Sequence, residues 1–195
     1  SRETKSEIGG PSRAREPLEP TCPPSEPSRL TDQAPAALAL YARLGFEIRE
    51  PVLTLQGPAI AQALPGRGVR AARELDLEAC NQVCRSVHGH DRSGELADAI
   101  QHGTAQVVEY HGRVTGYTTG IAFFSHSVGE SNDDLKTLIG AAKEFGGAGV
   151  LVPARNSGLV RWCLEHGLRI VQVMTLMSVG LYNEPAGAFL PSVLY

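Results

Sequence analysis

Two stretches of this chain carry the same pattern of an amphipathic helix, a glycine and a strand. Residues 34–48, APAALALYARLGFEI, align without a gap on residues 156–170, NSGLVRWCLEHGLRI. Gly45 falls on Gly167, and apolar residues coincide at helical spacing. A few residues further on, VLTL matches VMTL if the offset changes by one. We interpret the match as an internal repeat, which constrains the fold because both copies must belong to the same kind of unit.

The repeat implies that the first copy is incomplete. Residues 1–30 hold six of the 13 prolines, and the first aromatic residue is Tyr41, so this part cannot bury enough apolar surface to become ordered. The counterpart of the second unit would begin roughly fifty residues before Ser1. We therefore expect four segments: a disordered Pro-rich segment at 1–31, a remnant of a first domain at 32–57, a linker at 58–68 and a second domain at 69–195.

The second unit alternates helical and strand patterns. A hairpin is expected at 105–128 around the turn HGR, and Asp76 is a plausible N-cap. Further strands are predicted at 69–75, 149–154 and 169–180, and helices at 76–89, 94–103, 131–145 and 157–167. This order favours an α/β (α+β mixed) fold with a mixed, mostly antiparallel sheet flanked by helices.

Composition narrows the classes of function. The net charge is −3 and no basic stripe appears, so we expect no nucleic-acid partner. No apolar run is long enough to cross a bilayer and no signal peptide is visible, so we expect no membrane partner and a cytoplasmic location. The four cysteines have no metal-ligand spacing, and we expect no metal. The formation of a homo-oligomer is left open.

The stretch ALALYARLGFEI resembles the closing helix and strand of GNAT-superfamily N-acetyltransferases, which carry Leu-Tyr and then Gly-Phe four residues after the Tyr. The second unit follows the element order of that fold and contains GRVTGY in its hairpin. A chain that combines this closing helix and strand with the second unit looks like a tandem bacterial GNAT protein with a truncated first copy. The resemblance covers about residues 32–195 at the level of the fold.

The resemblance implies that an acetyl group is transferred from acetyl-CoA to a small-molecule amine. In that family acetyl-CoA lies in a gap between two splayed strands, and its pyrophosphate rests on a loop at a helix N-terminus. A tyrosine on the last helix commonly protonates the leaving thiolate. Tyr41 occupies that position here, whereas Cys163 replaces it in the second copy. The family's Asn is Ala34 in the first copy and is retained as Asn156 in the second.

The phosphate-binding loop departs from the family pattern. Where the second unit would hold a pyrophosphate, it has VGESNDDLKTLI. Ser131 and Asp134 can form a capping box there, and Glu130 and Asp133 add negative charge. We therefore expect the donor site to be largely lost in this chain. The candidates for residual contact with the cofactor are Ser131, Arg155 and Asn156, although Asn156 is equally explained as an N-cap.

Two further sets of residues are candidates for the acceptor side. His88, His90 and Asp91 in HGHDR lie where the family places its acceptor pocket, and a helix-ending loop explains them as well. In addition to Tyr41, His126 is a candidate catalytic residue and would act as a base, because the resemblance implies that its strand borders the transfer site. A buried core histidine and a packing tyrosine are the structural alternatives.

The sequence thus leaves three hypotheses. The first is a fragment of a tandem GNAT-like N-acetyltransferase. The second is a non-catalytic GNAT-like module that binds a ligand or scaffolds a catalytic copy. The third is an unrelated α/β domain, which would lack the splayed strand pair.

Overall fold

The computed structural model describes residues 29–180 and 182–193. The chain divides into two units, residues 1–37 and residues 38–195, and every strand among the described residues belongs to the second. Helix α1 (Arg29–Arg43) begins three residues before the helix that the sequence predicts. Most of the segment predicted to be disordered, residues 1–28, lies outside the described residues, while residues 29–31 belong to α1.

A five-stranded antiparallel sheet forms one half of the second unit. Its order is β2-β3-β4-β5-β8. The strands are β2 (Arg67–Ala71), β3 (Gln106–Tyr110), β4 (Arg113–Thr118), β5 (Ser127–Gly129) and β8 (Ala188–Leu190). The expected hairpin is β3–β4, closed by His111 and Gly112, which have φ values of 50° and 75°. Two positive φ values match the tight turns that connect twisted strands.

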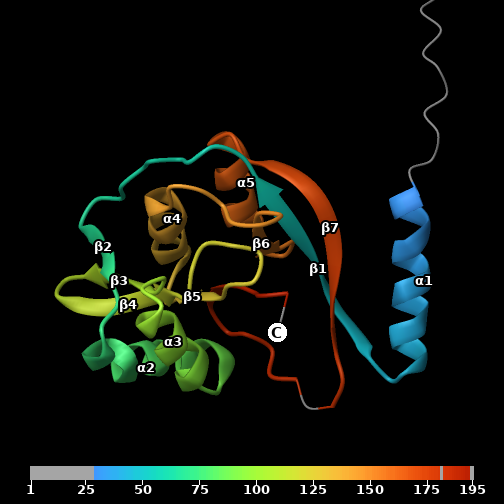
Figure 1. Ribbon diagram of the computed structural model, residues 1–195, viewed down its shortest axis with the longest axis horizontal. Coiled ribbons are helices and arrows are strands. Elements are labelled where there is room, and N and C mark those ends of the chain that lie inside the picture. The colour runs from blue at the N-terminus through green and yellow to red at the C-terminus, as the bar shows by residue number, and fades with distance from the viewer. Residues whose placement is uncertain (1–28, 181, 194–195) are drawn as a thin grey trace, which may run out of the picture. The chain divides into compact units, whose positions relative to one another are not determined.

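A second, three-stranded antiparallel sheet has the order β6-β1-β7. Its strands are β6 (Val150–Pro153), β1 (Glu47–Gln56) and β7 (Arg169–Ser178). The central strand β1 comes from the N-terminal side of the chain and lies between two strands of the C-terminal part (Figure 1). Val52 pairs with Pro153 on one side and with Met174 on the other.

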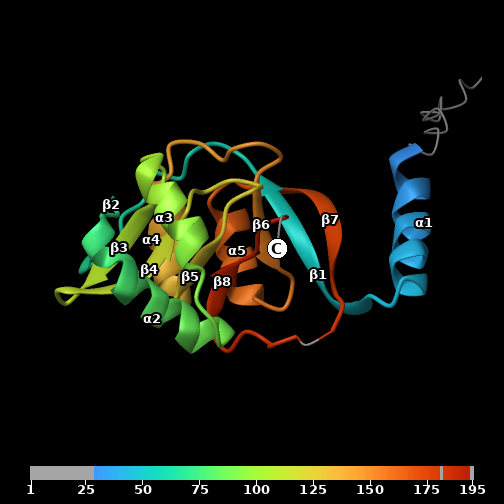
Figure 2. The same ribbon diagram turned by 60° about the horizontal axis from the view of Figure 1, so that its bottom comes forward.

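Helices cover both faces of the five-stranded sheet (Figure 2). A 3-10 turn (Glu74–Asp76) leads into α2 (Leu77–His88), and α2 and α3 (Ser93–Gln101) lie on one face. Helix α4 (Asn132–Ala141) contacts the other face, and α5 (Ser157–Glu165) lies beside α4. The fold is therefore mixed, with mostly antiparallel sheets flanked by helices, as the sequence predicts.

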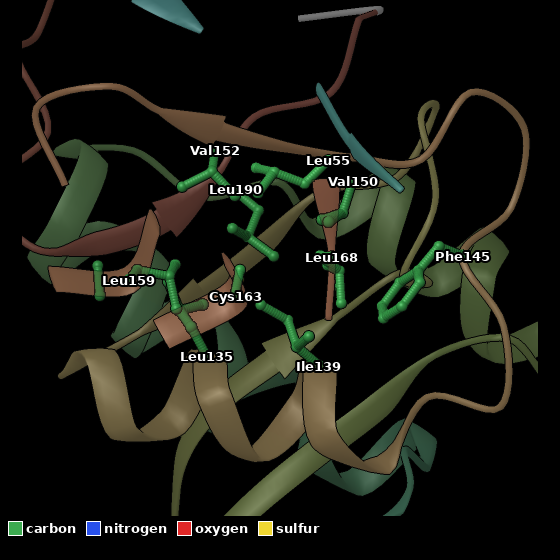
Figure 3. Packing of buried hydrophobic residues seen from close by; sticks show 11 residues of the cluster. Leu55, Leu135, Ile139, Phe145, Val150, Val152, Leu159, Cys163, Leu168 and Leu190 are labelled. Carbon is green, nitrogen blue, oxygen red and sulfur yellow. The ribbon is translucent and has the colours of Figure 1, made fainter. Parts of the chain in front are cut away.

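Two apolar clusters form the core. One packs α4 and α5 against β1, β6 and β8, as Figure 3 shows. The other packs α2 and α3 against the opposite face of the five-stranded sheet. The short strand β8 serves both, since Ala188 and Leu190 belong to the first cluster and Phe189 to the second. This alternation is the period of two expected of a strand that is buried on both faces.

The two halves of the sequence repeat adopt the same local geometry. Gly45 and Gly167 both have a φ of +91°, the left-handed region that favours glycine after a helix. The four backbone hydrogen bonds that end α1 have equivalents at the end of α5; for example, Phe46 N–H donates to the Tyr41 carbonyl, and Leu168 N–H to that of Cys163. The two helix-to-strand segments therefore share their turn as well as their residue pattern.

The pairing of β1 with β7 repeats this equivalence. The register is interrupted at Arg49 in β1 and at Val171 in β7, and the two strands span residues that are equivalent at an offset of 122 throughout. The one-residue change of offset suggested by VLTL and VMTL is therefore wrong. Such a slip would move every side chain to the opposite face of the sheet.

Several local expectations are also wrong. The strand predicted at 69–75 ends at Ala71, and Asp76 does not cap α2 with its side chain. Its carboxylate instead accepts hydrogen bonds from the Arg70 guanidinium and the Arg73 amide. No pattern in the sequence predicts β8, because a three-residue strand followed by Pro191 is defined by its neighbours and not by its own periodicity.

The burial of β8 predicts a large effect of the Phe189→Ala substitution on stability. Phe189 is 3% exposed and its ring packs edge-on against the His88 ring, so its removal leaves a cavity in the core. We expect a loss of about 3 to 5 kcal/mol in the free energy of unfolding, measured by urea denaturation. The matched control is Phe124→Ala, because Phe124 is 60% exposed, and a change within about 0.5 kcal/mol is expected there. Equal effects of the two substitutions would contradict the burial of β8.

Candidate functional site

The gap in which the resemblance places acetyl-CoA would lie between β5, which leads into α4, and β6, which follows it. These two strands do not pair with each other among the described residues. Strand β8 pairs with β5 and lies beside β6 (Figure 2). The space between the two strands is therefore occupied by residues 188–190 of the chain itself.

The N-terminus of α4, where a pyrophosphate would bind, is closed by the expected capping box. The buried carboxylate of Asp134 accepts hydrogen bonds from the Ser131 amide at 2.9 Å and from the Ser131 hydroxyl at 2.8 Å. It also accepts from the Thr115 hydroxyl at 2.7 Å and from Arg67 Nε at 3.2 Å. Any Cβ at Gly129 would lie 2.8 Å from the Asp134 Cβ, so this close approach requires glycine. The anion at this helix end is a side chain of the protein.

The neighbouring acids are paired with cations, which corrects the expected charge of this region. Glu130 forms a bidentate ion pair with Arg113, at 2.5 and 2.6 Å. Asp133 lies 3.1 Å from Lys136 Nζ. The acids are thus partly neutralised, and the obstacle to a diphosphate is occupied hydrogen-bonding groups more than net negative charge. Together with β8 in the gap, these residues do not fit acetyl-CoA at this position.

Ser131, Arg155 and Asn156, the three candidates for cofactor contact, line one cavity of about 440 Å³. It lies where α4 and α5 begin, and residues 185–189 form another of its walls. Asn156 caps α5, since its Oδ1 accepts from the Leu159 amide at 3.3 Å. Its side chain also exchanges two hydrogen bonds with Asn132, at 2.7 and 2.8 Å.

Arg155 carries the positive charge at this cavity. Its Nη1 lies 2.5 Å from Glu184 Oε1, and its Nε lies 3.3 Å from Glu50 Oε2. The pKa of Glu50 is raised above its ordinary value. Burial is the largest cause, the positive charge of Arg155 opposes it, and the negative charge of Glu184 adds to it. Arg155 is 39% exposed at its side chain, so the group can reach solvent while it bridges the two acids. The cavity is polar and contains one partly exposed guanidinium, a group that suits a small anion.

His88 and His126 form a buried pair. Their Nε2 atoms are 3.2 Å apart, and the side chains are 1% and 0% exposed. Burial lowers the pKa of His88 to about 4, with smaller contributions from His90 and Arg92. Burial also holds the pKa of His126 well below its usual range, again with Arg92 and the other histidines contributing. One ring therefore donates and the other accepts in a neutral pair, and the Nδ1 of His126 has no hydrogen-bond partner among the described residues.

His90 and Asp91, the other two candidate residues of HGHDR, lie at the surface. His90 Nδ1 lies 3.1 Å from the His88 carbonyl oxygen, and Asp91 accepts from Ser93 Oγ at 2.8 Å and from Arg85 at 3.1 Å. His88 is thus brought to His126, while Asp91 organises the start of α3. Within residues 29–180 and 182–193, no group of three His, Cys, Asp or Glu side chains could hold a metal ion.

Tyr41 lies in a different place from these residues. It is 47% exposed, its ring packs edge-on against Phe46, and both line an apolar cavity of about 220 Å³ with residues of β7 and of the segment 191–193. No contact in the described part of the chain joins Tyr41 to His126. The two predicted catalytic residues are therefore not brought into one site by this chain.

Asn132, Thr115 and Arg67 contact residues of the candidate site, and the sequence did not indicate any of them. Asn132 follows the N-cap Ser131 and reaches Asn156, and the other two hold Asp134. Each acts across two or more elements, so no spacing in the sequence marks it.

The chain matches no model of a known protein family and no curated protein. Among solved structures it is similar to the crystal structure, at 2.25 Å resolution, of a candidate acetyltransferase from Pyrococcus horikoshii. The TM-score is 0.58 at 13% sequence identity, and the similarity covers 76% of this chain and 52% of the other. This chain therefore spans about half the length of that protein. The similarity shows a common fold of the acetyltransferase type. Separately, no helix in the described part of the chain has the length and apolar character needed to cross a membrane.

The buried histidine pair predicts a stability that falls as the pH decreases. The unfolded chain binds protons near pH 6.5, whereas the folded pair stays neutral, so the unfolded state binds more protons between about pH 6.5 and 4. His88 alone accounts for a loss of about 2 kcal/mol between pH 7 and pH 5, measured by urea denaturation.

The variant His88→Gln should show a smaller loss over this interval, whereas His102→Gln, in which an exposed histidine is removed, should keep the dependence of the parent chain. A free energy of unfolding that is constant between pH 7 and pH 5 would contradict the neutral buried pair.

Proposed function

We propose that this chain is a GNAT-like unit of a tandem N-acetyltransferase and that it does not itself bind acetyl-CoA. The observation that carries the proposal is β8, which occupies the gap between β5 and β6. The capping of α4 by Asp134 supports it, because the helix N-terminus already has an anion. In this proposal residues 69–195 form the unit, and residues 32–57 are the end of a preceding copy.

The reaction proposed for the whole protein is transfer of an acetyl group from acetyl-CoA to an amine. The amine attacks the thioester carbonyl, the new C–N bond forms as the C–S bond breaks, the nitrogen gives up one proton to a base or water, and a general acid protonates the departing thiolate. The donor site belongs to the preceding copy, and Tyr41 is the residue of this chain placed to serve it. Tyr41 is half-exposed at the rim of an apolar cavity, so a preceding copy can reach its hydroxyl.

Isothermal titration with acetyl-CoA tests the proposal. We expect no saturable heat up to about 1 mM ligand, because the gap and the helix N-terminus are both filled. An acetyltransferase of known affinity, titrated with the same ligand stock, serves as the positive control. Saturable binding at micromolar concentration would show that this unit keeps a donor site.

The second candidate function is a module that binds a small anionic ligand, and the cavity beside Arg155 favours it. The guanidinium bridges two acids and stays partly exposed, so a ligand carboxylate or phosphate can replace one of them. In a thermal-shift screen of amino acids, small carboxylates and inorganic phosphate, a ligand that binds this cavity should then raise the melting temperature. Loss of the shift in Arg155→Gln, but not in Arg161→Gln, would assign binding to this cavity. An unchanged melting temperature with all ligands would exclude this function.

A further inference from the structure

An apolar surface at the β7 side of the three-stranded sheet is left open in this chain. It consists of Tyr41, Phe46, Met174, Met177 and the outer edge of β7, and we call it the open surface. Among the described residues β7 pairs along one edge only, with β1. Leu40 and Leu44, on the same helix as Tyr41, are 56% and 63% exposed. A ten-residue edge strand with apolar side chains is a surface that proteins normally cover.

The repeat shows what covers the equivalent surface elsewhere in the molecule. Strands β1 and β7 are related by a local two-fold axis at the pair Val52 and Met174, because the interruptions of their pairing at Arg49 and Val171 are symmetric about it. The axis relates α1 to α5 in sequence and in the geometry of the turn that follows each helix.

Each residue of the open surface has a buried equivalent across this axis. Cys163 is the equivalent of Tyr41, Leu168 of Phe46, and Leu55 of Met177. These three are 0%, 2% and 0% exposed and belong to the core that α4, β6 and β8 complete, as seen in Figure 3. The same positions are thus core on the β1 side and open on the β7 side.

The strand that covers the β1 side is β6. It pairs with the edge of β1 that faces away from β7, from Val52 to Leu55. The equivalent edge on β7 runs from Met174 to Met177, and these residues line the apolar cavity. The free backbone groups of β7 therefore lie where an equivalent of β6 would pair, and the cavity extends from there to Val52, Leu151 and residues 191–193.

We propose that the open surface binds the sheet of a preceding GNAT-like copy in the same polypeptide, whose strand equivalent to β6 pairs with the outer edge of β7. That copy has lent its last strand, β1, to the present unit and completes its own sheet with β7. This inference rests on the proposed function and specifies the contact between the two copies. Tyr41 would then lie in the core-facing wall of the preceding copy, as Cys163 does here.

A second copy of this chain is a poor occupant. The outer edge of β7 needs a strand like β6 with a free edge, but β6 already pairs with β1 on one side and lies beside β8 on the other. The similar Pyrococcus horikoshii chain is about twice as long as the region that this chain matches.

Hydrogen exchange measured by mass spectrometry tests the proposal on two polypeptides: the 195-residue chain, and the same chain extended by the residues that its gene encodes before Ser1. In the shorter chain we expect fast exchange of alternate β7 amides, while β1 amides, which are paired on both sides, exchange slowly. In the extended chain the β7 amides between Met174 and Met177 should slow at least about ten-fold.

The matched variants are Met177→Glu and Leu55→Glu. In the 195-residue chain, Met177→Glu should leave the melting temperature nearly unchanged and Leu55→Glu should unfold the protein. In the extended chain, Met177→Glu should also destabilise and should restore fast exchange in β7. This readout is independent of acetyl-CoA, so it can fail while the proposed function stands.

Three results would overturn the inference. The first is that the β7 amides exchange hydrogen equally fast in the 195-residue and in the extended chain. The second is that the sequence before Ser1 encodes no strand and helix. The third is protection of β7 in the 195-residue chain that rises with concentration together with dimer formation in sedimentation, which would assign the surface to a second copy.

Discussion

The structure depends on the insertion of β1 between β6 and β7. A strand in a sheet must satisfy its backbone donors and acceptors on both edges, and β6 and β7 do not pair with each other among the described residues. β1 supplies both partners, and its Leu55 is fully buried in the cluster shared by α4, α5 and β6. The part of the chain that the sequence marks as a remnant is therefore the centre of the sheet.

The C-terminal strand β8 belongs to the other sheet. β1 occupies the place between β6 and β7, while β8 pairs with β5 and lies beside β6. There it fills the gap in which the resemblance places acetyl-CoA, with Phe189 against His88, and Ala188 and Leu190 in one cluster with residues of α4.

The polar residues of the unit follow from this closure. Asp134 binds Arg67, Thr115 and Ser131, so the helix end that could attract a phosphate is neutralised internally. His88 and His126 are enclosed beneath β8, where burial keeps both neutral. An accessible polar cavity remains around Arg155, at the beginning of α5.

The sequence by itself determined the local units. The helical spacing and glycine of ALALYARLGFEI predict a helix, a left-handed turn and a strand, and the same pattern around Gly167 reveals the repeat, because turn geometry and periodicity are set by neighbouring residues. The capping box at Ser131 and Asp134 was predictable for the same reason. Only the tertiary structure decided which strands pair. It placed β1 in a sheet with strands of the predicted domain at 69–195, made β8 a strand and separated Tyr41 from His126. These outcomes depend on pairing between residues more than a hundred positions apart, or on burial by distant elements.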